Sequence, residues 1–146
     1  MSALSQSIKD AHILVVDDTP IMRALMARHL RETGFSNVSE VEDGKQAIEH
    51  VETNPVDFVL LDIVMPNMDG FETLERLNSS GKLQTMAVVM VTTVDDIESV
   101  ARCLELGAAD YMPKLFNPIL LNARIQSNLN LLFMRRRLRE LGEVAE

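Results

Sequence analysis

The sequence ILVVDD at residues 13–18 joins four consecutive apolar residues to two carboxylates. A short apolar run of this kind is typical of a strand that is buried inside a parallel sheet. Charged groups are costly to bury without compensation, so an acidic pair that closes such a strand is rarer than an isolated surface acid. Because ligands bind at the carboxyl ends of parallel strands, we expect Asp17 and Asp18 to belong to a site.

Four further strand-like runs occur along the chain, at residues 38–41, 58–61, 87–91 and, more weakly, 109–112. Between the runs, apolar residues recur with helical spacing from Pro20 to Gly34, Gly44 to Asn54, Gly70 to Ser79, Asp96 to Gly107 and Pro118 to Gly142. Strands that alternate with helices predict an α/β fold, a doubly wound five-stranded parallel sheet with right-handed crossovers.

Two of the expected helices carry apolar stripes that we predict to pack against the sheet. The stripe of the first helix consists of Ile21, Leu25, Met26 and Leu30. The stripe of the fourth helix, at i, i+3, i+4 and i+7, consists of Ile97, Val100, Ala101 and Leu104.

The composition excludes several classes of protein. With 146 residues, of which 47% are hydrophobic and 25% charged, the chain suits one globular domain. The net charge of −8 argues against direct binding of nucleic acid, which normally needs a basic face. No apolar run approaches the roughly 18 residues of a membrane span, and residues 1–10 lack the apolar core of a signal peptide. The single cysteine, Cys103, cannot form an internal disulfide, so we expect a cytoplasmic protein without membrane contact.

The last helix is longer than the sheet requires. Nothing interrupts it from Pro118 to Gly142, which gives roughly 24 residues or about 36 Å. In its second half apolar residues repeat at intervals of three and four, as in a coiled-coil seam: Leu131, Met134, Leu138, Leu141 and Ala145. We therefore divide the chain into a flexible leader (1–10), a domain (11–128) and a helical extension (129–146). The extension would be a dimerising stalk or a linker, with a frayed, solvated tail as the alternative.

Three more polar residues follow apolar runs as Asp17 and Asp18 do: Asp62, Thr92 and Lys114. In the flavodoxin-like strand order 2-1-3-4-5, the first and third strands are neighbours at the topological switch point, so the three carboxylates would converge. They would raise one another's pKa unless a cation intervened. Mg²⁺ fits, since it takes oxygen ligands and is usually held by one or two carboxylates together with phosphate. The sequence therefore predicts a divalent-cation site beside a phosphoryl group.

These motifs resemble the receiver domain of two-component response regulators, over about residues 10–128. The resemblance is carried by the acidic pair after the first strand, DIVMPNMDG at residues 62–70, VTT at 91–93, GAADY at 107–111 and PK at 113–114. The nine-residue run is the most specific of these motifs, and all of them occur in the order and at the spacing of the family.

The resemblance implies that Asp62 accepts a phosphoryl group from a sensor histidine kinase or a phosphotransfer protein, as carboxylate nucleophiles do elsewhere. It implies that Asp18, Asp62 and the backbone carbonyl of Val64 hold Mg²⁺ directly, and that Asp17 holds it through water. Mg²⁺ is thus the expected cofactor.

The resemblance also implies a switch. Lys114 would pair with the phosphoryl oxygens and Thr92 would hydrogen-bond one of them, so that catalysis rests on positioning and charge neutralisation. As Thr92 moves, Tyr111 on the fifth strand would swing inward and change the face that this strand forms with the fourth and fifth helices. Phosphorylation would thereby control homodimerisation or the docking of an output partner.

Three alternatives remain open. A haloacid-dehalogenase-like phosphatase also uses an aspartate nucleophile with Mg²⁺, but it needs Asp-x-Asp, and Val64 occupies the second position; we therefore expect no turnover of an external substrate. A dimerisation scaffold that does not depend on phosphorylation is disfavoured by the intact acidic pocket, but Leu115, where the family usually has proline after the lysine, keeps it open. The Lys-Leu pair and the charged helical extension resemble receiver fragments of larger regulators with a diguanylate cyclase or phosphatase output.

Overall fold

The computed structural model describes residues 8–93, 96–114 and 117–145, with side chains described as far as Gly142. It contains one five-stranded parallel sheet whose strands lie in the order β2-β1-β3-β4-β5. The strands are β1 (Ile13–Val16), β2 (Val38–Val41), β3 (Phe58–Leu61), β4 (Ala87–Thr92) and β5 (Asp110–Pro113). The predicted flavodoxin-like strand order is confirmed, and each strand lies within one residue of its predicted bounds.

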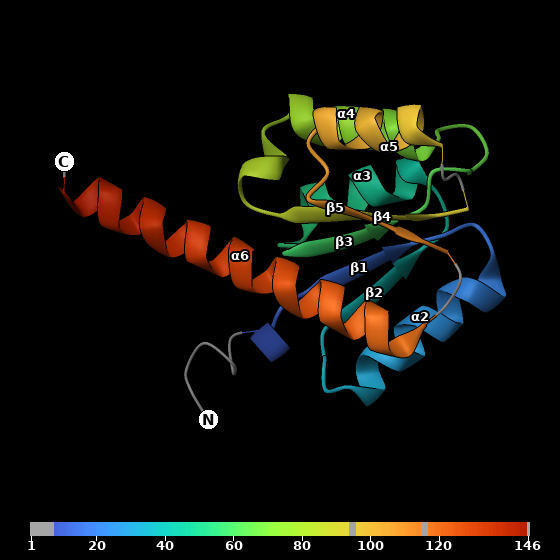
Figure 1. Cartoon of the computed structure of the whole chain (residues 1–146), viewed down its shortest axis with the longest axis horizontal. Helices are drawn as coiled ribbons and strands as arrows, with labels where there is room; N and C mark the ends of the chain where they lie inside the picture. Colours follow the sequence, from blue (N-terminus) through green and yellow to red (C-terminus); the bar gives the residue numbers. More distant parts are fainter. Residues whose placement is uncertain (1–7, 94–95, 115–116, 146) are drawn as a thin grey trace.

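Helices cover both faces of the sheet (Figure 1). They are α2 (Pro20–Glu32), α3 (Gly44–Thr53), α4 (Gly70–Ser79), α5 (Ile97–Glu105) and α6 (Pro118–Ala145), with a short 3₁₀ turn, η1 (Lys82–Gln84), after α4. Helices α2 and α6 lie on one face, and α3, α4 and α5 lie on the other. This is the doubly wound arrangement that the alternation of strands and helices predicts.

The central strands are buried on both faces because every residue in them is apolar. In β1, Ile13 and Val15 belong to the core between the sheet and the α2 and α6 helices. Leu14 and Val16 belong to the second core, beneath α3, α4 and α5. Successive side chains of a strand point to opposite faces, so one continuous apolar run serves both cores.

Aspartates begin three of the helices. Asp43, Asp69 and Asp96 are N-caps whose side chains accept a hydrogen bond from the backbone N–H three residues later. Such a cap contributes about 1 kcal/mol to helix stability. Pro20 lies in the first turn of α2, where its missing N–H has no cost.

The predicted apolar stripes of two helices are partly wrong. Ile21 and Leu25 in α2 are 82% and 40% exposed, and Ile97 and Leu104 in α5 are 86% and 49% exposed. The helix α5 instead turns Cys103 to the sheet, where it is fully buried. Helical periodicity shows that one face is apolar, but it does not decide which face the neighbouring elements cover.

Helix α6 first packs on the sheet and then extends beyond it (Figure 1). Leu121, Ile125, Leu129 and Leu132 are buried in the core. Its 28 residues correspond to about 42 Å, which confirms the predicted long helix. Among the helices that the structure describes, none combines the length and apolarity that a membrane crossing requires.

The end of the expected leader lies against the domain. Ile8 is 2% exposed within the core, and the Lys9 ammonium donates a 2.8 Å hydrogen bond to the carbonyl of Thr33 after α2. Lys9 also lies 4.4 Å from the centre of the Phe35 ring, at a distance typical of a cation–π contact.

Candidate functional site

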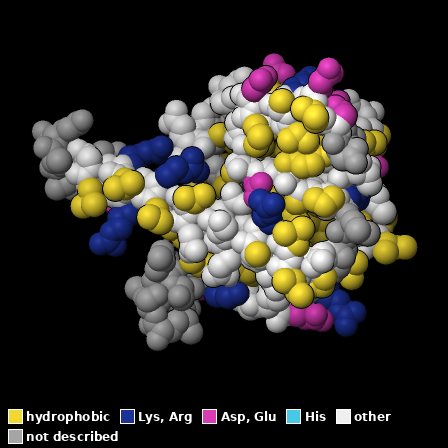
Figure 2. Space-filling model, in the orientation of Figure 1, with side chains coloured by type: hydrophobic (Ala, Val, Ile, Leu, Met, Phe, Trp, Pro, Cys, Tyr) yellow, Lys and Arg dark blue, Asp and Glu magenta, His cyan; other side chains and the backbone are white. Residues whose placement is uncertain are grey.

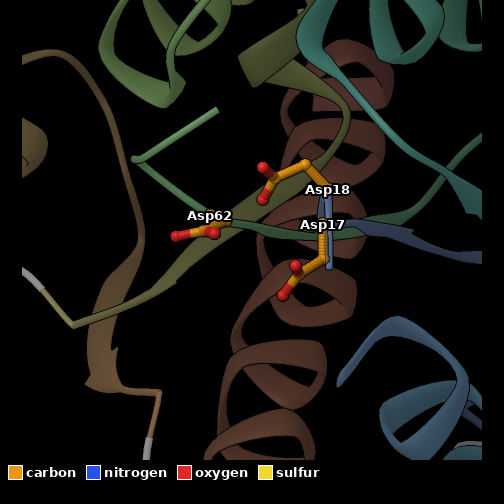
Figure 3. Close-up of side chains that lie close together, drawn as sticks. All are labelled: Asp17, Asp18 and Asp62. Atoms are coloured by element: carbon orange, nitrogen blue, oxygen red, sulfur yellow. The ribbon is translucent and has the colours of Figure 1, made fainter. Parts of the chain in front are cut away.

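The three predicted carboxylates meet at the carboxyl ends of β1 and β3. These strands are direct neighbours, with Val16 paired to Leu61, so Asp17 and Asp18 follow one strand beside Asp62 on the other. Figure 3 shows Asp17 and Asp18 leaving the end of β1 on opposite sides, with Asp62 next to them. One carboxylate oxygen from each residue lies within 4.8 Å of the others. The predicted convergence is present.

Lys114 brings a positive charge into this group. Its Nζ lies 2.8 Å from Oδ2 of Asp62, and 3.3 and 3.2 Å from Oδ1 and Oδ2 of Asp17. The Lys114 backbone N–H donates a 2.9 Å hydrogen bond to the carbonyl of Thr92, which ties the residue after β5 to the end of β4. One ammonium therefore bridges two carboxylates that come from different strands.

Burial and charge shift the pKa values of this cluster. Burial raises the pKa of Asp62, and the charge of Asp17 adds to the rise, although the Lys114 ammonium and the Val64 N–H act against it. Burial tends to lower the pKa of Lys114, but the hydrogen bond and charge of Asp62, together with Asp17, raise the pKa above its ordinary value. The carboxylate of Asp62 and the ammonium of Lys114 thus each favour the charged form of the other.

The two adjacent aspartates have different environments. Asp17 is 2% exposed, and its Oδ1 accepts a 2.8 Å hydrogen bond from the backbone N–H of Thr19, whereas Asp18 is exposed. Arg23, one turn into α2, donates a 2.7 Å hydrogen bond to the Asp17 carbonyl. Sequence reasoning missed Arg23, because an arginine on a helix surface carries no signal that it reaches back to the preceding strand.

Thr92 and Tyr111 lie on one face of adjacent strands. Thr92 ends β4 and is 1% exposed, and Tyr111 in β5 pairs with Met90, two residues before Thr92. Side chains two residues apart on a strand share a face, so Thr92 and Tyr111 point to the same side of the sheet. Tyr111 is half-buried against the core beneath α3, α4 and α5.

The loop after β3 folds back over the site. Val64 donates its backbone N–H to Oδ1 of Asp62 at 3.4 Å, and its side chain is 59% exposed. Asn67 adopts a left-handed backbone conformation with φ of 69°, which asparagine tolerates better than most residues. The Val64 carbonyl as a metal ligand stays a prediction. Leu115, on which the scaffold alternative depends, lies outside the described residues.

Gly70 closes this loop against the backbone of Asp62, and we expect Gly70→Ala to destabilise the protein. A methyl group at position 70 would lie 2.3 Å from the Asp62 carbonyl oxygen and 2.7 Å from Cα of Ile63. Overpacking against backbone should lower the free energy of unfolding by about 3 kcal/mol, measured by urea denaturation. Gly142→Ala is the control, because nothing lies within 4 Å of that position in the α6 helix; an equal loss there would contradict the explanation.

The donor set fits a small, hard divalent cation. Asp17, Asp18 and Asp62 offer only oxygen, and within the described part of the chain they form the one group of three or more potential ligand residues of this kind. Mg²⁺ prefers oxygen ligands and keeps several waters, which the exposed Asp18 side of the cluster allows. Three carboxylates beside a single ammonium also leave excess negative charge for a cation to neutralise.

Comparisons with known proteins agree with this geometry. The model of the response regulator receiver domain family matches residues 13–126. The chain is 35% identical over 124 residues to the probable transcriptional regulator ycf27 of Cyanidium caldarium, covering 85% of this chain but only 48% of that protein. It is 37% identical over 108 residues to the two-component response regulator ORR11 of Oryza sativa subsp. indica, covering 73% of each. The chain thus spans about half the length of the first of these relatives.

Solved structures agree as well. The chemotaxis protein CheY4 of Vibrio cholerae superposes with a TM-score of 0.76 at 27% identity, over 81% of this chain and 98% of that one. A putative two-component system response regulator/GGDEF domain protein superposes with a TM-score of 0.80 at 29% identity, over 87% of this chain and 52% of that one. With an acidic cluster bridged by a lysine at the switch point of the sheet, the chain belongs to the response regulator receiver domain family.

Proposed function

We propose that Asp62 accepts a phosphoryl group from a sensor histidine kinase or a phosphotransfer protein. The observation that carries the proposal is the position of its carboxylate, held at 2.8 Å by Lys114 and flanked by two further carboxylates. A bond would form between a carboxylate oxygen of Asp62 and phosphorus while the bond from phosphorus to the donor nitrogen breaks. The donor histidine would leave with its electron pair.

The acidic cluster supports a role for Mg²⁺ in this transfer. Asp18 and Asp62 would hold the ion directly, with the Val64 carbonyl, and Asp17 would hold it through water. When bound, Mg²⁺ would neutralise the charge that develops on the phosphoryl oxygens. Lys114 would exchange part of its pairing with Asp62 for the phosphoryl oxygens, and the hydroxyl of Thr92 would donate to one of them.

The shared face of Thr92 and Tyr111 supports the proposed switch. When Thr92 turns to the phosphoryl group, Tyr111 would move inward and change the surface formed by α5, β5 and α6. The helix α5 carries the apolar side chains of Ile97 and Leu104, which are 86% and 49% exposed. Covering apolar surface of this kind is the usual source of affinity between proteins, so the switch would control homodimerisation or the docking of an output partner.

The output is a separate proposal. The GGDEF-containing neighbour shows that a receiver of this shape occurs in a longer regulator, and α6 extends beyond the sheet where a further domain would attach. We infer a role as the receiver of a cytoplasmic regulator, without turnover of an external substrate and without direct contact to nucleic acid. A scaffold that dimerises without phosphorylation is the alternative.

Removal of Mg²⁺ tests the phosphoacceptor proposal. After incubation with acetyl phosphate and Mg²⁺, intact-mass spectrometry should show the gain of one phosphoryl group. With EDTA in place of Mg²⁺ we expect labelling to slow by about a hundredfold, because charge neutralisation at the transferring group is lost. Restoring Mg²⁺ to the same sample is the control. Equal labelling with and without the metal would contradict the proposed role of the cluster.

A further inference from the structure

Beyond residue 130, helix α6 has two distinct faces. One face binds the domain through Leu132, which is 1% exposed, and through Arg136. The other face is apolar and exposed. It consists of Leu131, Met134, Leu138 and Leu141, which are 57%, 55%, 66% and 56% exposed and which we call the α6 seam. Figure 2 shows hydrophobic and basic side chains together on the protruding part of this helix.

Arg136 fixes the direction of the helix. Its guanidinium lies 2.9 Å from Oδ1 of Asp57 and also donates to the carbonyl of Thr85. Asp57 itself accepts a 2.8 Å hydrogen bond from the backbone N–H of His12 at the start of β1. The helix is thereby anchored to the amino-terminal edge of the sheet, opposite the acidic cluster. Because Arg136 lies on the far side of the helix from the seam, the anchored helix presents the seam outward.

The α6 seam has the spacing of a two-stranded coiled coil. Its residues follow one another at intervals of 3, 4 and 3, which places Leu131 and Leu138 at a positions and Met134 and Leu141 at d positions of a heptad. In this register Arg136 is at position f, the position farthest from a partner helix. The Arg136 contact and the seam therefore lie on different sides of the helix, and only the first seam residue, Leu131, also borders the domain, in a hollow that it lines with Ala87 and Ala109.

We propose that the α6 seam pairs in parallel, and in register, with the seam of a second copy of this chain. This inference rests on the self-association in the proposed function, but not on Asp62 as phosphoacceptor. In the parallel pair each seam residue meets its own counterpart, as the two-fold symmetry of a homodimer requires. Leucine and methionine side chains then cover one another without any polar group being buried.

The residues that flank the seam decide the orientation. Asn130 and Arg137 occupy g positions, and Arg135 and Gly142 occupy e positions. In a parallel pair each g residue faces the e residue five positions later on the other helix, so Asn130 meets Arg135 and Arg137 meets Gly142. The amide oxygen of Asn130 can accept a hydrogen bond from the Arg135 guanidinium. No pair of like charges arises.

An antiparallel pair would be opposed by charge. With the seams fully overlapped in opposite directions, e positions face e positions and g positions face g positions. Arg135 would then meet Arg135 of the other copy, and Arg137 would meet Arg137. Like charges that face each other destabilise a pair and are a common determinant of coiled-coil orientation. The seam of two heptads is short of a standard interface, so we expect a weak dimer that depends on concentration.

Cysteine cross-linking distinguishes the two orientations. In the parallel pair, Leu141→Cys places the two thiols opposite each other. In the antiparallel pair each thiol would face Leu131 of the other copy, so the two thiols would lie about 15 Å apart along the helix axis. We expect the disulfide-linked dimer of Leu141→Cys to form at least about tenfold faster than that of Arg139→Cys, which faces away from the seam. The native Cys103 is fully buried and can remain. Circular dichroism verifies that both variants are folded.

The cross-linking rates decide between the parallel pair and the antiparallel pair, and light scattering decides whether the chain pairs at all. Cross-linking of Leu141→Cys no faster than that of Arg139→Cys would overturn the parallel pair, as would preferential cross-linking of Leu141→Cys with Leu131→Cys in a mixture. In light scattering the wild type should dimerise as its concentration rises, and Leu138→Glu, changed at a 66% exposed position, should dimerise at least about tenfold more weakly. A wild type that stays monomeric at every concentration would also overturn the proposal. So would a wild type that pairs only with an acidic helix of another protein. Repeating the cross-linking of Leu141→Cys in the Asp62→Asn background separates this proposal from the proposed function. If the pairing does not depend on phosphorylation, cross-linking should be unchanged even though Asp62 can no longer accept a phosphoryl group.

Discussion

Asp62→Asn is expected to abolish phosphoryl labelling by acetyl phosphate. The amide keeps the size of the side chain and an oxygen that can accept from the Lys114 ammonium, so the local structure should persist. It removes the negative charge and the nucleophilic oxygen on which an acyl phosphate would form. We expect no detectable gain of mass in the variant under conditions in which the wild type gains one phosphoryl group.

Asp43→Asn provides the matched control for this experiment. Asp43 is the N-cap of α3, where its side chain accepts from the Gln46 N–H at 2.8 Å, and asparagine caps a helix as well as aspartate does. The same chemical change there should leave labelling intact. If Asp62→Asn still gained one phosphoryl group, peptide mapping would identify the acceptor, and transfer to the exposed Asp18 would overturn the assignment to Asp62.

The centre of the sheet was predictable from local sequence because β1, β3 and β4 are buried on both faces. The run at residues 13–16 has no polar residue and continues into Asp17, so both its length and its end were evident. The strand order is that of flavodoxin-like folds, in which the first and third strands are neighbours, so that Asp17 and Asp62 lie side by side at the switch point. The strand β2 was also predicted at residues 38–41, although its residues are partly buried or exposed.

The helix faces were less predictable, because an apolar stripe has no direction of its own. Ile97 starts α5 and is 86% exposed, whereas Cys103 on the same helix is fully buried. Both residues are apolar, and only the packing of α5 against the sheet separates them. The same holds in α2, where Ile21 is exposed and Leu30 is fully buried. An exposed apolar stripe of this kind is typical of a surface that binds a partner.

In the candidate site, the sequence predicted which residues converge but not how they contact one another. Lys114 was expected to pair with the oxygens of a phosphoryl group, and in the structure its ammonium pairs with both Asp17 and Asp62. Such a pairing depends on the side-chain distances across three strands, which no local pattern contains. The 2.7 Å hydrogen bond from Arg23 to the Asp17 carbonyl was missed for the same reason.

Lys114→Met is expected to lower the free energy of unfolding by about 2 kcal/mol in the absence of Mg²⁺. Asp17 and Asp62 are 2% and 3% exposed, so without the ammonium their charges would repel each other in a poorly solvated place. The loss is smaller than for a fully buried pair, since the Lys114 side chain is 14% exposed. Added Mg²⁺ should stabilise the variant more than the wild type, because it neutralises the carboxylates that the lysine no longer pairs.

The pH dependence of this loss follows from the directions of the pKa shifts. The pKa of Lys114 is raised above 10.5, so its contribution to stability is complete at neutral pH and disappears only as the pH rises through that raised pKa. The pKa of Asp62 is already raised above 3.8 by burial and by Asp17, and losing Lys114 raises it further. A carboxyl with a raised pKa destabilises the fold when it is charged. The cost of Lys114→Met should therefore shrink as the pH falls from 7 towards the pKa of Asp62.

Urea denaturation at pH 5 and pH 7, with and without Mg²⁺, measures both effects. Lys45→Met is the control, because Lys45 is exposed on α3 and its loss should have little effect under any of the four conditions. Equal midpoints for Lys114→Met and the wild type at pH 7 without metal would mean that the ammonium contributes no net stability. The bridge would then serve only to position Asp62. A variant that is destabilised equally at both pH values, and that Mg²⁺ does not rescue, would instead point to lost packing of the lysine stem rather than lost charge.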